Sequence, residues 1–255
     1  MKTWTKAAMA ATMMCGLAMA GDDARPVPGS GLIDSPGNYV LQGDRRSVST
    51  SRAAIEITAS DVTLDLNGTM ISGPGGKLGV GVRIMGASGV QVKNGLLSNL
   101  AFGVIVMNSR NVVLKDLQIR GEGLPIVTLP PETAIMIVQS RNVVVEDNAI
   151  YNTGLGIFVR GGMSGGNRIA NNTLTAGMNG ALGICYNPAD NDPMGPRGDL
   201  IYGNLVSGFG TGIQASSMSM ANVFKANTIF YRGGKAIELM NDTNMEMDNT
   251  SAMLP

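Results

Sequence analysis

The residues that could carry chemistry in this sequence are carboxylates and arginines, because the chain contains no histidine. The absence of histidine excludes a Ser-His-Asp triad, an imidazole metal site and other His-dependent mechanisms. Asp65, Asp116 and Asp147 fall on separate repeats, so they do not form the dense acidic cluster that hydrolysis by paired carboxylates requires. We interpret them as turn or solvated surface residues, and we assign no residue a catalytic role.

Two arginines and a phenylalanine are the main candidates for contact with a sugar. In short strands of the form Gly/Ala-apolar-x-apolar, side chains alternate between the two faces, which directs Arg83 outward. Arg160 projects outward at the end of its strand, and the same count directs outward Ile105, Met136, Phe158, Cys185, Gln214 and Glu238. A row of this kind could meet an acidic sugar, and solvated salt bridging is the alternative role of the arginines.

Two inserted loops flank this face, and loops on a rigid scaffold are the usual place for recognition. They are residues 121–132 (GEGLPIVTLPPE) and residues 187–198 (NPADNDPMGPRG). The apolar stripe around Phe158 is either a groove that stacks on sugar rings or a patch covered by the first loop. Asp190 and Asp192 resemble a loose pair of calcium ligands, although the spacing of a complete calcium loop is missing. We include both among the substrate-binding candidates and predict no metal site and no cofactor, with calcium as an alternative.

An internal repeat must position these candidates. The segment SRNVVLKDLQI begins at Ser109, and SRNVVVEDNAI begins at Ser140. Units with period-2 strands and Gly, Asn or Asp turns cannot bury their apolar side alone, so successive units must stack. The sequence therefore predicts an all-β, single-stranded parallel β-helix of about seven coils, aligned on Leu64, Val92, Leu114, Val145, Ile169, Ile201 and Phe224.

One column of the repeat is rich in asparagine. Two copies carry Gly95 and Leu117 at this position, three residues after the alignment residue. The other five carry Asn67, Asn148, Asn172, Asn204 and Asn227. Stacked asparagines can bond both to one another and to the backbone, so we predict an internal asparagine ladder. The alternative is that asparagine is simply common in turns.

The sequence resembles the right-handed parallel β-helix superfamily, which includes pectate-lyase-like proteins, and within it the NosD-like or carbohydrate-binding-and-hydrolase group. The resemblance is carried by DVTLDLNG from Asp61 to Gly68 and by the Gly-Ile-x-Val type strands that follow, and it covers roughly residues 33–240. It implies a right-handed coil. Its implication for function is broad, because this fold hosts lyases, hydrolases, epimerases, adhesive modules and accessory proteins.

The N-terminal segment has the features of a secretory signal: an early positive charge, an apolar run and a small-x-small cleavage site, Ala18-Met19-Ala20. We expect an exported protein, periplasmic or extracellular, with no membrane span. The expected segments are a signal peptide at 1–20, an N-terminal segment and cap at 21–58, the β-helix at 59–240 and a Met-rich, flexible tail at 241–255.

The charge balance restricts the possible classes of binding partner, and the cysteine content restricts disulfide formation. The chain has 19 Lys and Arg against 19 Asp and Glu, and loss of Lys2 and Lys6 with the signal leaves 17 against 19. This balance points to neither a nucleic acid nor a polybasic membrane partner. Cleavage also leaves Cys185 as the single cysteine, which excludes an intramolecular disulfide. The oligomeric state stays open.

Three functions fit the residues and the resemblance. The first is an exported protein that binds an extended polysaccharide or oligosaccharide across the face bearing Arg83, Phe158 and Arg160. The second is a lyase-like or epimerase-like enzyme that acts on acidic polysaccharide without histidine. The third is an accessory protein in periplasmic copper handling, which the NosD resemblance implies. Thioethers bind Cu(I), and the tail carries Met240, Met245, Met247 and Met253.

Overall fold

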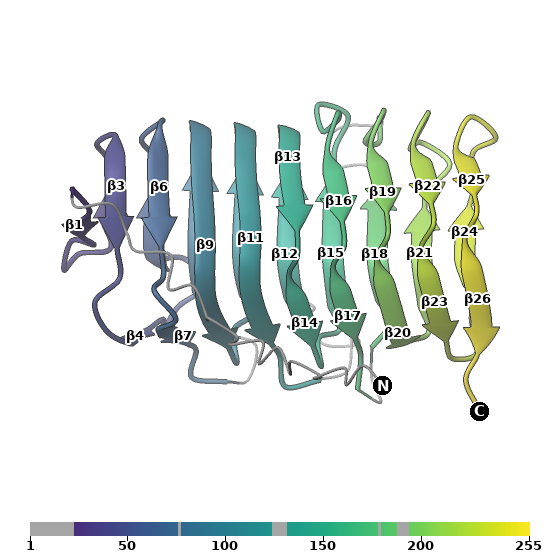
Figure 1. Ribbon diagram of the computed structural model, residues 1–255, viewed down its shortest axis with the longest axis horizontal. Helices are drawn as coiled ribbons and strands as arrows, with labels where there is room; N and C mark the ends of the chain where they lie inside the picture. The colour runs from purple at the N-terminus through teal and green to yellow at the C-terminus, as the bar shows by residue number, and fades with distance from the viewer. Residues whose placement is uncertain (1–22, 76–77, 124–131, 178–179, 188–193) are drawn as a thin grey trace, which may run out of the picture.

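The computed structural model describes residues 23–75, 78–123, 132–177, 180–187 and 194–255. In these residues the protein is all-β, with 26 strands and no helix, and the strands wind into a parallel β-helix. Figure 1 shows successive coils side by side along the long axis, from the purple N-terminal end to the yellow C-terminal end. The predicted fold class is confirmed.

One face of the solenoid is a nine-stranded parallel sheet, which contains the second strand of every repeat. Its inward residues Val82, Val104 and Ile135 lie opposite one another, as the repeat predicts. The strands are β2 (Leu32–Ile33), β5 (Ala53–Ile57), β8 (Val80–Met85), β10 (Phe102–Met107), β12 (Thr133–Val138), β15 (Leu155–Arg160), β18 (Leu182–Asn187), β21 (Thr211–Ala215) and β24 (Ile237–Leu239).

The remaining strands form a seventeen-stranded sheet that each coil crosses in two steps. The first row is β1 (Arg25–Pro26), β3 (Gly37–Val40), β6 (Val62–Asp65), β9 (Ser88–Ser98), β11 (Arg110–Arg120), β13 (Arg141–Glu146), β16 (Arg168–Ala170), β19 (Leu200–Tyr202), β22 (Val223–Lys225) and β25 (Met245–Met247). The second row is β4 (Arg45–Arg46), β7 (Met70–Ser72), β14 (Ala149–Tyr151), β17 (Thr173–Thr175), β20 (Leu205–Phe209), β23 (Thr228–Tyr231) and β26 (Thr250–Met253), and β9 and β11 run through both rows.

Within the described residues, the chain completes eight coils between β3 and β24. The additional coil relative to the seven repeat copies comes from the segment expected to form the N-terminal cap. There β3, β4 and β5 complete a coil, and Tyr39 lies opposite Leu64 of the next one. The capping segment is therefore part of the solenoid wall.

The C-terminal segment differs from the expected flexible tail. Strands β25 and β26 pair in parallel with β22 and β23, so the solenoid continues to Met253. The alignment did not extend this far because polar residues replace the inward apolar ones: Glu246 lies opposite Phe224, and Ser251 lies opposite Ile229. Glu246 and Ser251 are both exposed, so a polar residue is tolerated at these positions.

The predicted asparagine ladder is present, with one member wrong. Asn148, Asn172, Asn204 and Asn227 are buried, and each side-chain oxygen accepts the backbone N–H of the ladder residue in the preceding coil. Asn67 is exposed instead, at a positive φ of 52°. The step from Leu64 to this column is one residue shorter than in the next coil, so the buried Leu66 stacks on Gly95 in the ladder column.

Candidate functional site

The outer face of the nine-stranded sheet carries the predicted row of outward side chains, which we call the outer row. Successive strands place its members directly opposite one another. They are Arg83, Ile105, Met136, Phe158, Cys185, Gln214 and Glu238. The geometry of the row is confirmed, and the role of its members in sugar binding stays a prediction.

The middle of this face is apolar. Ala53, Val80 and Ile105 form a buried cluster separate from the solenoid core, with Phe102 and Met136 packed against it. Along the outer row, Ile105 and Cys185 are buried, whereas Met136 and Phe158 are half-buried. A ligand could therefore reach the row at Met136 and Phe158. The apolar loop residues that were expected as a cover lie outside the described residues.

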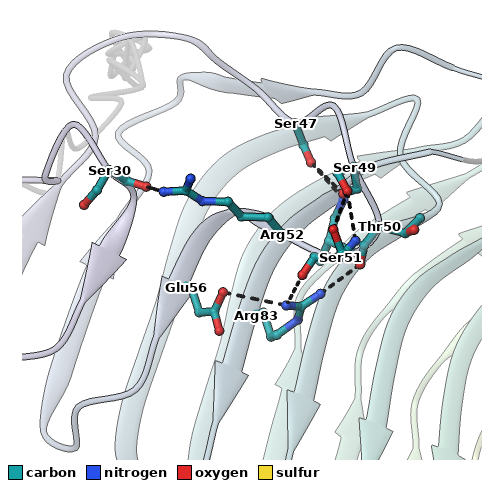
Figure 2. A network of polar contacts seen from close by, with 9 residues as sticks. Ser30, Ser47, Ser49, Thr50, Ser51, Arg52, Glu56 and Arg83 are labelled. Carbon is teal, nitrogen blue, oxygen red and sulfur yellow. Dashed lines mark hydrogen bonds and ion pairs between the residues drawn. The ribbon is translucent and has the colours of Figure 1, made fainter.

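Arg83 is held by its neighbours, as Figure 2 shows. Its Nη1 donates to the carbonyl of Ser51 and its Nη2 to the carbonyl of Thr50, each at 3.0 Å. Nη1 also lies 3.6 Å from the carboxylate of Glu56. Because these contacts engage both terminal nitrogens, Arg83 fixes the Thr50–Ser51 segment against the sheet.

Phe158 and Arg160 form a pair on β15. The Arg160 guanidinium carbon lies 5.5 Å from the centroid of the Phe158 ring, which is within cation–π distance. Burial raises the pKa of the adjacent Cys185 thiol to about 12, against the opposing effect of the Arg160 charge. The thiol therefore stays protonated at neutral pH and does not act as a nucleophile.

Glu238 lies at the far end of the outer row. Its carboxylate accepts hydrogen bonds from Lys235 Nζ at 2.7 Å and Gln214 Nε2 at 2.8 Å. These bonds, first that of Lys235, lower the pKa of Glu238. Three strand spacings, about 14 Å, separate it from Phe158. The structure therefore does not bring Glu238 into one site with Phe158 and Arg160.

Among the described residues, the structure contains no cluster of candidate metal ligands. Across the described ranges, no three or more Cys, Asp and Glu side chains come together in a way that could hold a metal ion. Asp190 and Asp192 lie outside the described residues. The tail methionines are exposed and spread over three elements, the end of β24, β25 and β26. Copper binding by these sulfurs stays a prediction.

Sequence reasoning missed two arginines that line a cavity of about 400 Å³. Arg110 and Arg141 begin strands β11 and β13 and lie opposite each other in register. They are the central residues of the two Ser-Arg-Asn segments that made the repeat visible. The repeat itself was the available signal, because equal positions in successive coils are neighbours in space.

A second cavity, of about 580 Å³, lies on the second row of the larger sheet. Arg120 and Tyr151 stand opposite each other there, and both are exposed. Met70, Leu96 and Gln118 complete much of its lining. This surface combines an aromatic ring, a cation and an amide, and it is the alternative place for a sugar on this protein.

No helix long and apolar enough to cross a bilayer occurs in the described part of the chain.

The comparisons with known proteins agree with this architecture. The family described as "Right handed beta helix region" matches residues 38–192, and no curated protein sequence matches the chain significantly. Among solved structures, an alginate lyase from Paenibacillus sp. str. FPU-7 superposes with a TM-score of 0.51 at 13% identity, over 89% of this chain and 95% of the lyase.

Two further solved structures are similar over most of this chain. A polygalacturonase from Erwinia carotovora ssp. carotovora gives a TM-score of 0.53 at 14% identity, over 89% of this chain and 64% of the enzyme. The tailspike protein of E. coli bacteriophage HK620, in complex with a pentasaccharide, gives 0.53 at 10% identity, over 88% of this chain and 53% of the tailspike. At these identities the similarity establishes a shared fold.

Proposed function

Because the chain belongs to the right-handed β-helix family, we propose that it is an exported protein that binds an extended polysaccharide along the outer face of its nine-stranded sheet. The choice of ligand class is supported by three proteins of the same fold whose names state an action on a glycan or a complex with one. They are a lyase, a polygalacturonase and a tailspike. The solenoid supports the choice of an extended ligand, since its surface repeats along one axis.

The observation that carries the proposal is the Phe158–Arg160 pair. An apolar ring with a cation 5.5 Å from its centroid offers both a surface for the C–H face of a sugar and a positive charge for an acidic sugar. Because the ring already restrains the guanidinium, less side-chain entropy is lost when a ligand binds. The adjacent Met136 is half-buried and extends this surface to the next strand.

Binding is favoured over turnover. The chain has no histidine, the Cys185 thiol is held protonated by burial, and the contacts of Arg83 are with two carbonyls and Glu56. An arginine engaged in this way is a poor base for proton abstraction. A lyase-like or epimerase-like enzyme remains the alternative, and its signature would be a change in the mass of the glycan.

Native mass spectrometry with a panel of neutral and acidic oligosaccharides, with and without calcium, tests the proposal. We expect bound and unchanged glycan, with affinity reduced about tenfold by Phe158→Ala. Tyr151→Ala is the matched control, because it removes an aromatic ring from the second cavity instead. Loss of binding in Tyr151→Ala alone would assign the binding site to the larger sheet. Shortened or dehydrated products would show that the protein is an enzyme. The absence of a complex with any glycan would refute the proposal.

A further inference from the structure

The two Ser-Arg-Asn segments build identical turns in neighbouring coils. Their serines are buried, and the N–H of Ser109 donates to Oγ of Ser140 at 3.1 Å. Ser140 in turn donates its N–H to Oγ of Ser164 at 3.3 Å, so the ladder continues into the next coil. The asparagines occupy the left-handed region, with φ of 52° at Asn111 and 54° at Asn142. Each residue of the segment therefore has a fixed place in the turn.

The arginine of each segment is exposed, as is the asparagine that follows it. Arg110 and Arg141 lie opposite each other in register, one strand spacing or about 4.8 Å apart along the solenoid. Small residues continue the row on both sides, Ser88 before Arg110 and Gly165 after Arg141. Two large cations flanked by small residues leave a hollow between successive coils.

This hollow is the cavity of about 400 Å³, and most of its lining side chains are polar, with Ala87 and Met163 as the apolar ones. Besides the two guanidinium groups it contains hydroxyl and amide side chains and no carboxylate. The lining residues that bear these polar groups are Ser60, Ser88, Asn108, Ser109 and Gln139.

Each guanidinium is anchored through one nitrogen. Arg110 Nε donates to Oγ of Ser88 at 3.4 Å, and Arg141 Nε donates to the carbonyl of Met163 at 2.9 Å. Within the described parts of the chain, neither arginine has an ion pair, and their terminal Nη atoms have no hydrogen-bond partner. The anchored Nε fixes the plane of each group, and the terminal donors stay available.

We propose that this cavity is a binding site for an oxyanion, a carboxylate or a sulfate group, held between Arg110 and Arg141. A guanidinium fork matches the geometry of two oxygens on one carbon or sulfur atom and binds them with paired hydrogen bonds. The backbone positions of the two arginines are one strand spacing apart, so their like charges repel each other, and an anion bound in the cavity that both line offsets this repulsion. The oxyanion is either a free ion or a group carried by a polymer. The site does not depend on the polysaccharide proposal, because it lies on the turns beyond the end of the nine-stranded sheet.

The first measurement is thermal stability in sodium sulfate against sodium chloride at equal ionic strength. We expect sulfate to raise the melting temperature of the wild type with a saturable dependence, and to have no such effect on Arg110→Gln/Arg141→Gln. Arg46→Gln is the control, because Arg46 is exposed on β4 and lies outside this cavity. The Arg110→Lys/Arg141→Lys variant keeps the charge without the fork, and we expect it to lose most of the effect.

The second measurement distinguishes the source of the anion. Oligogalacturonate and its neutral methyl ester are titrated into the wild type and the double Gln variant. If the anion belongs to a polymer, the acid binds at least about tenfold tighter than the ester, and only in the wild type. A sulfate response without this difference would assign a free ion to the site. Equal sulfate responses of the wild type and the double Gln variant would overturn the inference, even if both proteins bind the neutral ester as the polysaccharide proposal allows.

Discussion

The side-chain amide and the backbone N–H of Asn172 both donate to the same oxygen, Oδ1 of Asn204, at 3.0 and 2.9 Å. The Asn172 amide also donates to the carbonyl of Val145 at 2.9 Å. One side chain therefore links three coils at a bend where backbone groups would otherwise be buried without partners. Both asparagines are 1% exposed, so water does not replace these bonds.

Replacing a rung in the middle of the ladder should be costly. We expect Asn172→Ala to lower the free energy of unfolding by roughly 3 kcal/mol, since it leaves the Asn148 N–H buried without this acceptor and removes the bond to the Val145 carbonyl. Chemical denaturation measures the difference. Asn67→Ala is the control and should change stability by less than about 0.5 kcal/mol, because Asn67 is exposed. Equal effects of the two variants would contradict the assignment of the ladder.

A second polar ladder contains one carboxylate. Oδ1 of Asp199 accepts the N–H of Asn167 at 2.8 Å, and the Asp199 N–H donates to Oδ1 of Asn222 at 3.0 Å. Burial, which outweighs the bonds from Asn167, raises the pKa of Asp199 from 3.8 to about 6. The Tyr186 hydroxyl is buried beside Asp199 and also opposes this rise. Above pH 6 the ladder therefore holds a buried negative charge.

The folded state binds the Asp199 proton more tightly than the unfolded state does. The contribution of this group is therefore greatest below pH 4, falls as pH rises to about 6, and is constant above that. We expect Asp199→Asn to remove this fall and to stabilise the protein at pH 7 by roughly 2 kcal/mol. Thermal melts of both proteins from pH 4 to pH 7 give the difference, and a difference that does not vary with pH would exclude the predicted titration.

Arg83 should stabilise the loop that contains Thr50 and Ser51. We expect Arg83→Met to speed amide hydrogen exchange in residues 49–52, because the carbonyls of Thr50 and Ser51 lose their charged donor. Glycan affinity should change little. Arg46→Met serves as the control, since Arg46 is exposed on β4. If exchange stays unchanged while glycan binding is lost, Arg83 is a ligand contact.

The C-terminal strands should be needed for stability. Ending the chain after Asn241 removes Asn244 and Asn249, which accept the N–H groups of Asn222 and Asn227. It also leaves β22 and β23 as open edges, so we expect a lower melting temperature and aggregation. Met245→Ser/Met247→Ser changes only exposed side chains and should leave stability nearly unchanged. A truncated protein that melts like the full chain would restore the view of residues 241–255 as a flexible tail.

The sequence was sufficient to predict the solenoid and much of its register. Alternation placed Arg83, Met136 and Phe158 in one row, and the pairing of the strands confirms that row. Asp65, Asp116 and Asp147 were interpreted as turn or surface residues. Asp116 and Asp147 are exposed and adopt positive φ, 54° and 56°, in equivalent turns. The interpretation is wrong for Asp65, which is 4% exposed and accepts a hydrogen bond from Asn94. These features follow from backbone periodicity, which a repeat records directly.

The sequence-based predictions were wrong where a single residue or a single side chain determines the local structure. A single missing residue moved Asn67 out of the ladder and put Leu66 into it, and an alignment on apolar positions does not detect such a shift. The contacts of Arg83 come from a loop outside the repeat, so no periodicity predicts them. Arg110 and Arg141 were visible in the sequence, but their significance depends on the hollow that Ser88 and Gly165 leave beside them.

The register between β9 and β11 is unbroken, so the coil formed by residues 88–109 could be deleted or duplicated. Its pairing runs from Ser88 opposite Arg110 to Ser98 opposite Arg120 without a shift, so both edges of the coil offer the same pattern of hydrogen bonds. A tandem duplicate of residues 88–109 could be spliced in after Ser109 and would find matching edges on either side. Each duplicate would lengthen the rod by about 4.8 Å at constant cross-section. The protein is thus a starting point for engineered rods of graded length.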